Sequence, residues 1–284
     1  MWLLEVAIVP LFLGVSLAYG QFTGGVNLVE VYATVTDSQG EPVAGLTAAD
    51  FGIREDGAAQ IISAFAAGEF PLSIAIGLDR SFSMGGRDNR LGLAKSAART
   101  LIGALRPDDQ LMVVAIGGET AIVAPLSTDR AAALSAIDRL DAWGTTPLYD
   151  AALAALDAIQ TARGRRALVL LSDGADRYSD ATAADLVDRA RRHDVLIYPV
   201  AVGSARPPVF AELAAATGGR SFFVREPRAL IQTMAGIARE LRSQYLIGYV
   251  PSRERSGEPA WHNIDVTVAR PDLRVRAREG YASR

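Results

Sequence analysis

The sequence has no cysteine, two histidines and a single lysine, Lys95. Without cysteine there can be no disulfide framework, no thiol nucleophile and no zinc–thiolate site. Two histidines, His193 and His262, argue against a histidine-rich metal site or a histidine-based catalytic triad. The formal net charge of −3 is small, so neither a nucleic-acid binder nor a polybasic membrane surface is expected. Half of the 284 residues are hydrophobic, which is enough to bury the core of one large or two modest domains.

Residues 1–20 are predicted to be a secretory signal peptide. The stretch from Leu3 to Ala18 is apolar except for Glu5, and small residues such as Ser16 and Gly20 suit a cleavage site. The run is short for a membrane span, and it lacks the usual basic start. The alternative is an uncleaved anchor or a buried N-terminal strand. We therefore expect a bacterial protein that is secreted, periplasmic or otherwise part of the cell envelope.

Two β-rich segments, residues 21–70 and 243–284, are predicted to form one small β-sandwich. Apolar and polar residues alternate from Val29 to Val35 and again from Ile264 to Val268, which is typical of half-buried strands. Neither segment has enough strands to be stable alone. We expect the two segments to pair, with residues 71–242 inserted between them as a separate domain.

The inserted segment, residues 71–242, alternates apolar strands with long helical stretches. Several strands are continuous apolar runs, as expected for strands covered on both faces. This order predicts an α/β fold with a doubly wound, mostly parallel, Rossmann-like sheet. The predicted strands are Leu72–Leu78, Gln110–Ile116, Ala121–Pro125, Ala167–Leu171, Val195–Val202 and Ser221–Val224. The predicted helices lie near Leu91–Leu105, Arg130–Leu140, Leu148–Ala162, Ala183–His193, Val209–Ala216 and Arg228–Leu241.

Oxygen-bearing side chains follow two of these strands and one loop. Asp79, Ser81 and Ser83 come directly after the first strand of the inserted domain, and Asp173 follows Ala167–Leu171. Thr146 precedes Pro147, which is predicted to open a helix with Thr146 as its cap. Ligands bind beyond the carboxyl ends of strands in such sheets, so we expect these five residues to converge. Two carboxylates and three hydroxyls would suit a hard cation.

This pattern resembles the metal-ion-dependent adhesion site of von Willebrand factor A domains. The resemblance lies in Asp-x-Ser-x-Ser, a distant Thr before Pro, and Asp-Gly after a hydrophobic strand, in that order. The flanks "VEVYATVTDSQGEPVAGLTAADFGIREDG" and "QYLIGYVPS…REGY" are similar to VWFA-related proteins common in acidobacteria. The resemblance implies that Ser81, Ser83 and Thr146 bind the cation through their hydroxyls. It also implies that Asp79 and Asp173 act directly or through water.

The site departs from the commoner form of the motif at two positions. Glycine is frequent where this chain has Phe82, and Arg80 could add positive charge near the cation. Phe82 would therefore have to point away from the metal.

The donor set favours Mg²⁺. Mn²⁺ could substitute, while Ca²⁺ usually recruits more carboxylates and carbonyls. Zinc prefers nitrogen or sulfur ligands, which this set lacks. The resemblance implies that the open position takes an acidic side chain from a partner protein. We therefore expect a non-enzymatic protein-interaction module, with no nucleic-acid partner and no small-molecule substrate.

Two other functions compete with this interpretation. A structural envelope module with a vestigial metal site is the more serious one. A phosphotransfer enzyme could use Asp79 as its nucleophile. Haloacid-dehalogenase-like phosphatases, however, need a second Asp where this chain has Ser81, and a receiver domain needs a late lysine, whereas Lys95 is early. Asp176 and Asp180, close to the predicted rim, are interpreted as solvated loop residues.

Overall fold

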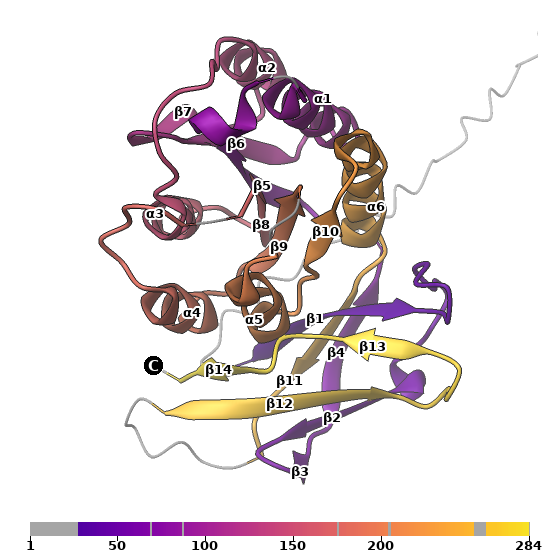
Figure 1. Ribbon diagram of the computed structural model, residues 1–284. Helices are drawn as coiled ribbons and strands as arrows, with labels where there is room; N and C mark the ends of the chain where they lie inside the picture. The colour runs from indigo at the N-terminus through magenta and orange to yellow at the C-terminus, as the bar shows by residue number, and fades with distance from the viewer. Residues whose placement is uncertain are drawn as a thin grey trace, which may run out of the picture.

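The computed structural model describes residues 28–283 except 69, 87, 175, 204–205 and 253–259. The predicted signal peptide, residues 1–20, lies outside the described residues. An α/β domain and a β-sandwich lie side by side, with both ends of the described chain in the sandwich (Figure 1). Within the described part of the chain, no helix combines the length and apolarity needed to cross a membrane.

A six-stranded sheet forms the centre of the α/β domain, in the order β10-β9-β8-β5-β6-β7. All neighbouring strands are parallel except β7, which runs antiparallel to β6. Every residue of β5 is buried, as its continuous apolar sequence predicts. The strands are β5 (Leu72–Asp79), β6 (Gln110–Ile116), β7 (Thr120–Ser127), β8 (Arg165–Ser172), β9 (Leu196–Val202) and β10 (Phe222–Val224).

Helices cover both faces of this sheet. Helices α1, α2 and α6 pack with Ile74 and Ile76 in one hydrophobic cluster, and α3, α4 and α5 pack with Ala75 and Leu168 in the other. The predicted doubly wound, mostly parallel fold is therefore confirmed. The helices are α1 (Arg90–Gly103), α2 (Arg130–Asp138), α3 (Leu148–Ile159), α4 (Ala183–Arg192), α5 (Pro208–Thr217) and α6 (Leu230–Arg242), with short 3₁₀ turns η2 (Phe82–Met84) and η3 (Pro227–Ala229).

The sandwich consists of two four-stranded sheets, β13-β1-β11-β4 and β14-β12-β2-β3. Each sheet combines strands from both ends of the chain, so the prediction that the two terminal segments share one sandwich is confirmed. Its core includes Val31, Phe51, Tyr245 and Ile264. The elements are β1 (Val29–Thr36), η1 (Ala48–Asp50), β2 (Phe51–Glu55), β3 (Ala58–Ala59), β4 (Ile62–Ala67), β11 (Tyr245–Tyr249), β12 (Trp261–Val268), β13 (Arg274–Arg276) and β14 (Gly280–Ala282).

Buried polar residues join the two domains. Arg165, at the start of β8, donates to Gln244 at 2.8 Å, and Gln244 donates to Thr34 of the sandwich at 2.9 Å. The guanidinium of Arg165 also lies 5.8 Å from the ring centre of Tyr32. Burial lowers the pKa of Arg165 to about 10. The junction therefore has a fixed hydrogen-bonded geometry.

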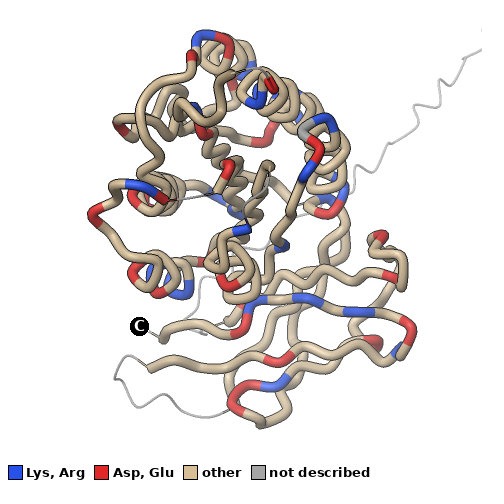
Figure 2. Tube along the Cα trace, in the orientation of Figure 1, with Lys and Arg blue, Asp and Glu red and all other residues tan. Residues whose placement is uncertain are grey.

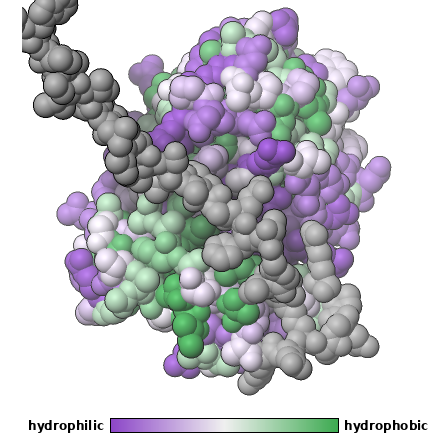
Figure 3. Space-filling view, turned by 180° about the vertical axis from the view of Figure 1, so that it is seen from behind, coloured by the Kyte–Doolittle hydropathy of each residue, from purple (hydrophilic) through white to green (hydrophobic). Residues whose placement is uncertain are grey.

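The surface has mixed charges and an apolar region on the sandwich. Acidic and basic residues are interspersed along the chain (Figure 2). Seen from behind, apolar side chains gather on the sandwich half of the molecule (Figure 3). Ile61, in the sandwich, is 86% exposed. The sandwich therefore has apolar surface of its own, separate from the rim of the α/β sheet.

Candidate metal centre

Asp79 and Ser172 meet where the order of the parallel strands reverses. Strand β5 is flanked by β6 on one side and β8 on the other, so its carboxyl end is the switch point at which such sheets bind ligands. Asp79 is the last residue of β5 and is fully buried. Its Oδ2 accepts a 2.6 Å hydrogen bond from the Ser172 hydroxyl, and its Oδ1 accepts one of 2.8 Å from the Ser81 backbone N–H.

The pKa of Asp79 is raised above its ordinary value of 3.8. Burial is the main cause, and the negative charge of Asp173 adds to it. The hydrogen bonds from Ser172 and Ser81 act in the opposite direction without cancelling the effect of burial. A carboxylate in this setting is stabilised by a nearby cation.

The two predicted serine ligands lie next to each other. Ser81 precedes the 3₁₀ turn η2, which Met84 anchors in the core of the domain. The Oγ atoms of Ser81 and Ser83 are 2.9 Å apart. Since Ser81 also donates its backbone N–H to Asp79, the Asp-x-Ser-x-Ser segment forms one connected group of oxygen atoms.

The loop that contains Thr146 is held against this segment by the backbone. Trp143 N donates to Arg80 O at 2.7 Å, and Phe82 N donates to Gly144 O at 3.1 Å. Gly144 has a φ of +81°, and a Cβ there would lie 2.0 Å from Gly118 N. Only glycine fits this position. Its φ lies in the left-handed region, and a Cβ would collide with the backbone of Gly118, which cannot move aside as a side chain could.

Thr146 is 4% exposed, and its carbonyl accepts from Leu148 N at 2.8 Å and from Arg177 N at 2.7 Å. Within the described part of the chain, its hydroxyl makes no hydrogen bond. Thr146 also lines the cavity described below. It is therefore available to a ligand in that cavity.

The prediction that Thr146 caps a helix beginning at Pro147 is wrong. Helix α3 begins at Leu148, its N-cap is Pro147, and no side chain of the cap residue bonds the helix. The neighbouring loop supplies the acceptor instead, since Asp176 Oδ1 accepts from Tyr149 N at 3.0 Å. Asp176 is thus a half-buried helix partner rather than the solvated residue expected from the sequence, whereas Asp180 is exposed.

Asp173 completes the set at the end of β8. One of its carboxylate oxygens lies 3.6 Å from Nη1 of Arg90, the first residue of α1. Asp173, Ser81, Ser83 and Thr146 line a cavity of about 430 Å³. Asp79 is buried and hydrogen-bonded to the serine segment. The structure therefore brings the five predicted residues together.

Exposed aromatic residues surround this cavity. Phe82 is 68% exposed, Tyr178 80% and Trp143 45%. Arg80 lies with its guanidinium carbon 5.1 Å from the centre of the Trp143 ring and donates to Asp141 O at 3.3 Å. Phe82 thus faces solvent, as the motif requires, and Arg80 is held by Trp143 and Asp141.

The residues present fit a hard divalent cation. The donors are oxygen atoms only, two of them carboxylates, and the Thr146 hydroxyl has no hydrogen-bond partner among the described residues. Two functional neighbours were not predicted from the sequence. Ser172, which holds Asp79, could have been noticed because it ends a buried strand directly before Asp173. The ion pair from Arg90 has no comparable signal, since Arg90 and Asp173 are 83 positions apart in the sequence.

Comparison with known proteins identifies the domain. Residues 74–175 match the family model of the von Willebrand factor type A domain. This part of the α/β domain therefore matches a von Willebrand factor type A domain, as the resemblance in the sequence indicated. The matched span contains all five predicted ligands. No curated protein matches the chain.

Solved structures share this fold at low identity. A von Willebrand factor type A protein from Catenulispora acidiphila is 16% identical with a TM-score of 0.55, over 93% of this chain and 74% of that one. Proximal thread matrix protein 1 from the mussel byssus, with a zinc-occupied MIDAS motif, is 18% identical with a TM-score of 0.55, over 68% of this chain and 50% of that one. BatB from Bacteroides thetaiotaomicron is 19% identical with a TM-score of 0.50, over 61% of this chain and 100% of that one.

Proposed function

We propose that the protein is a non-enzymatic interaction module that binds a partner protein through a magnesium ion held by Asp79, Ser81, Ser83, Thr146 and Asp173. The observation that carries this proposal is that Ser81, Ser83, Thr146 and Asp173 line one rim cavity, with Asp79 hydrogen-bonded to the backbone of Ser81. The Thr146 hydroxyl has no hydrogen-bond partner among the described residues. Von Willebrand factor A domains commonly mediate protein–protein interaction, which supports the same conclusion. We infer a secreted or envelope location from residues 1–20.

The proposed partner group is a carboxylate. A bound Mg²⁺ supplies positive charge and a coordination position for an oxygen ligand. The two carboxylates of the site balance that charge only roughly, and the serine and threonine hydroxyls add none. Arg177, which is exposed at the cavity, adds positive charge on the same face. An acidic side chain is therefore the ligand that this charge distribution favours.

The aromatic surroundings define the rest of the contact. Phe82, Tyr178 and Trp143 are exposed at the cavity or beside it, and Trp and Tyr are enriched among residues that dominate binding energy at interfaces. We expect the partner's acidic side chain to be flanked by apolar residues that cover Phe82 and Tyr178.

The experiment separates metal binding from partner binding. Calorimetric titration with Mn²⁺ or Mg²⁺ should show one site in the wild type and none in Ser83→Ala. Immobilised protein should then retain a partner from envelope extract in Mg²⁺, release it in EDTA, and bind it again when Mg²⁺ is restored. Phe82→Ser and Tyr178→Asn should keep the metal and weaken the partner, and asparagine suits the φ of +71° at residue 178. Equal partner binding in EDTA would place the interaction elsewhere, with the apolar surface of the sandwich as the next candidate.

A structural envelope module is the second candidate. The ion pair between Arg90 and Asp173 favours it, because a guanidinium beside a predicted ligand can neutralise the site without a metal. The titration decides between the two: a protein that binds no divalent cation at millimolar concentration would be such a module.

A further inference from the structure

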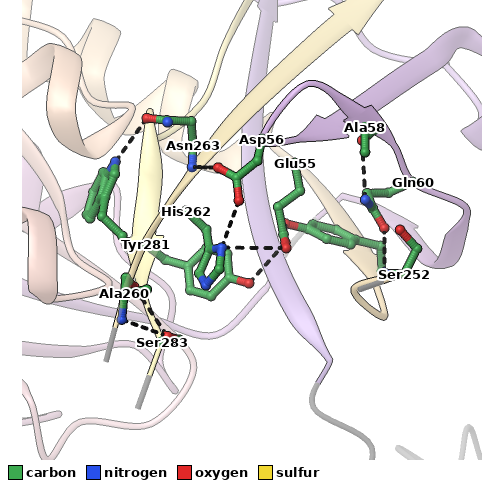
Figure 4. Close-up of polar contacts among 12 residues, drawn as sticks. Glu55, Asp56, Ala58, Gln60, Ser252, Ala260, His262, Asn263, Tyr281 and Ser283 are labelled. Carbon is green, nitrogen blue, oxygen red and sulfur yellow. Dashed lines mark hydrogen bonds and ion pairs between the residues drawn. The ribbon is translucent and has the colours of Figure 1, made fainter. Parts of the chain in front are cut away.

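A second group of potential metal ligands lies in the sandwich. Glu55 ends β2, Asp56 begins the turn to β3, and His262 lies on the neighbouring strand β12. Figure 4 shows one nitrogen of the His262 ring facing the carboxylates of Asp56 and Glu55, with Tyr281 beside the ring. One donor atom from each of the three residues lies within 4.8 Å of the others.

One histidine nitrogen faces both carboxylates. His262 Nδ1 is 2.9 Å from Asp56 Oδ2 and 3.8 Å from Glu55 Oε1. Donor atoms that share one cation at about 2.0 to 2.2 Å are separated by roughly 3 to 4 Å, so these spacings are compatible with a common ion. The set combines one imidazole with two carboxylates, unlike the all-oxygen rim of the α/β domain.

Each of the three side chains is oriented by a further contact. Glu55 Oε2 accepts hydrogen bonds from the hydroxyls of Tyr249 at 2.6 Å and Tyr281 at 2.9 Å. Asp56 Oδ1 accepts from the backbone N–H of Asn263 at 2.9 Å. The His262 ring stacks on Tyr281 with the ring centres 5.2 Å apart. One oxygen of each carboxylate is thus fixed by the fold while the other faces His262, as is usual when outer contacts orient metal ligands.

Glu55 is the most buried of the three side chains. It is 6% exposed, and its Oε1 accepts no hydrogen bond from any described residue. The separation of 3.8 Å from His262 Nδ1 is too long for a hydrogen bond. This carboxylate oxygen faces the nitrogen of a potential metal ligand and is open to a further partner.

We infer that Glu55 Oε1, Asp56 Oδ2 and His262 Nδ1 form a binding site for one divalent cation of the zinc class. Imidazole with carboxylates suits Zn²⁺, whereas Mg²⁺ prefers oxygen ligands alone. Three protein ligands leave a fourth position for water, and the side chain of Asp56 is exposed enough to admit it. The ion would connect the β2–β3 turn to β12, and so the N-terminal and C-terminal parts of the sandwich.

The test uses the full chain with Asp79→Asn, which removes the rim site, so it is independent of the proposed function. With only two histidines, ¹⁵N spectra of the imidazole rings can be assigned by comparison with His193→Gln. One equivalent of Zn²⁺ should shift the Nδ1 resonance of His262, raise the melting temperature, and leave His193 unchanged. Millimolar Mg²⁺ should neither shift the Nδ1 resonance of His262 nor raise the melting temperature.

Variants of the site keep its fold. Asp56 has a φ of +49°, which asparagine tolerates, and asparagine can still accept the Asn263 N–H. Asp56→Asn should therefore weaken zinc affinity at least about tenfold. His262→Phe should abolish it while preserving the stack on Tyr281. Asp265→Asn, an exposed change on the same strand, is the matched control and should bind as before. An unshifted Nδ1 at one equivalent, a shift at Nε2 instead, or unchanged affinity in Asp56→Asn would overturn the inference.

Discussion

Replacing Thr146 with valine removes one hydroxyl and preserves the shape of the side chain. The hydroxyl has no hydrogen-bond partner among the described residues and lines a cavity that can hold water. Its removal should therefore change the stability of the metal-free protein by less than about 1 kcal/mol. Most hydroxyls at helix starts would give a larger loss, because they cap the helix, but α3 has no side-chain cap.

The effect should appear only when magnesium is present. A free concentration of 100 times the dissociation constant adds about 2.7 kcal/mol to the stability of the wild type. The melting temperature of a domain of this size changes by about 2 to 4 °C for each kcal/mol of stability, so it should rise by roughly 5 to 11 °C. A loss of about 100-fold in affinity, which mutation of even the outer contacts of metal sites can cause, reduces the gain to about 0.4 kcal/mol.

Thermal unfolding with and without Mg²⁺, followed by circular dichroism, measures both effects. Thr145→Val is the matched control, because it makes the same substitution at the exposed neighbouring residue. We expect wild type and Thr145→Val to gain stability from Mg²⁺ and Thr146→Val to gain almost none. A full magnesium-induced rise in Thr146→Val would show that this hydroxyl is not a ligand. An equal loss in EDTA would show that its role is structural.

Three further predictions concern the rim and the junction of the domains. Because the pKa of Asp79 is raised, the charged carboxylate destabilises the metal-free fold, and that stability falls as pH rises from about 3.8 through the folded-state pKa. Asp79→Asn should remove this fall in unfolding curves recorded in EDTA, whereas a parallel pH profile would contradict the buried charge. Gly144→Ala should lose about 1 to 3 kcal/mol in denaturant titration and weaken Mn²⁺ binding, since its Cβ would collide with Gly118 N; wild-type stability would show that the loop adapts. Removing residues 243–284 should cause aggregation, because β1, β2 and β4 lose their partners, while a fragment of residues 71–242 stays folded. Gel filtration with hydrogen exchange checks this, and a monomeric truncation with protected β1 amides would be evidence against the shared sandwich.

The architecture could be predicted because its signals are local and repeated. Continuous apolar runs such as Ala167–Leu171 identify strands covered on both faces, and alternation identifies strands covered on one face. Helix ends were less predictable. The start of α3 depends on Asp176, which lies 27 residues from Tyr149 in sequence and supplies the acceptor that Thr146 was expected to provide. No local pattern records that contact.

The candidate sites differ in how far they could be predicted. Asp79, Ser81 and Ser83 lie within one five-residue segment at the end of β5, and Asp173 directly follows the end of β8. Both strand ends can be recognised from their apolar runs. The Glu55–His262 pair is different, since its members are 207 positions apart and meet only through the register that places Ile264 opposite Glu55. From the sequence, His262 was one of two isolated histidines with no visible partner. Its partners, Glu55 and Asp56, are brought close by the pairing of β2 with β12, which the composition of the sequence does not reveal.

The insertion leaves the rim accessible to the proposed partner. The chain leaves the sandwich after Ala67 and returns at Tyr245, and these two residues are paired neighbours in β4 and β11. Strand β5 starts a few residues beyond this junction and ends at Asp79. Its eight residues, at about 3.3 Å each, place the candidate metal centre roughly 25 Å from the junction. The α/β domain is therefore attached at one end of its central strand and has the candidate site at the other, so the proposed partner would bind at the end away from the sandwich.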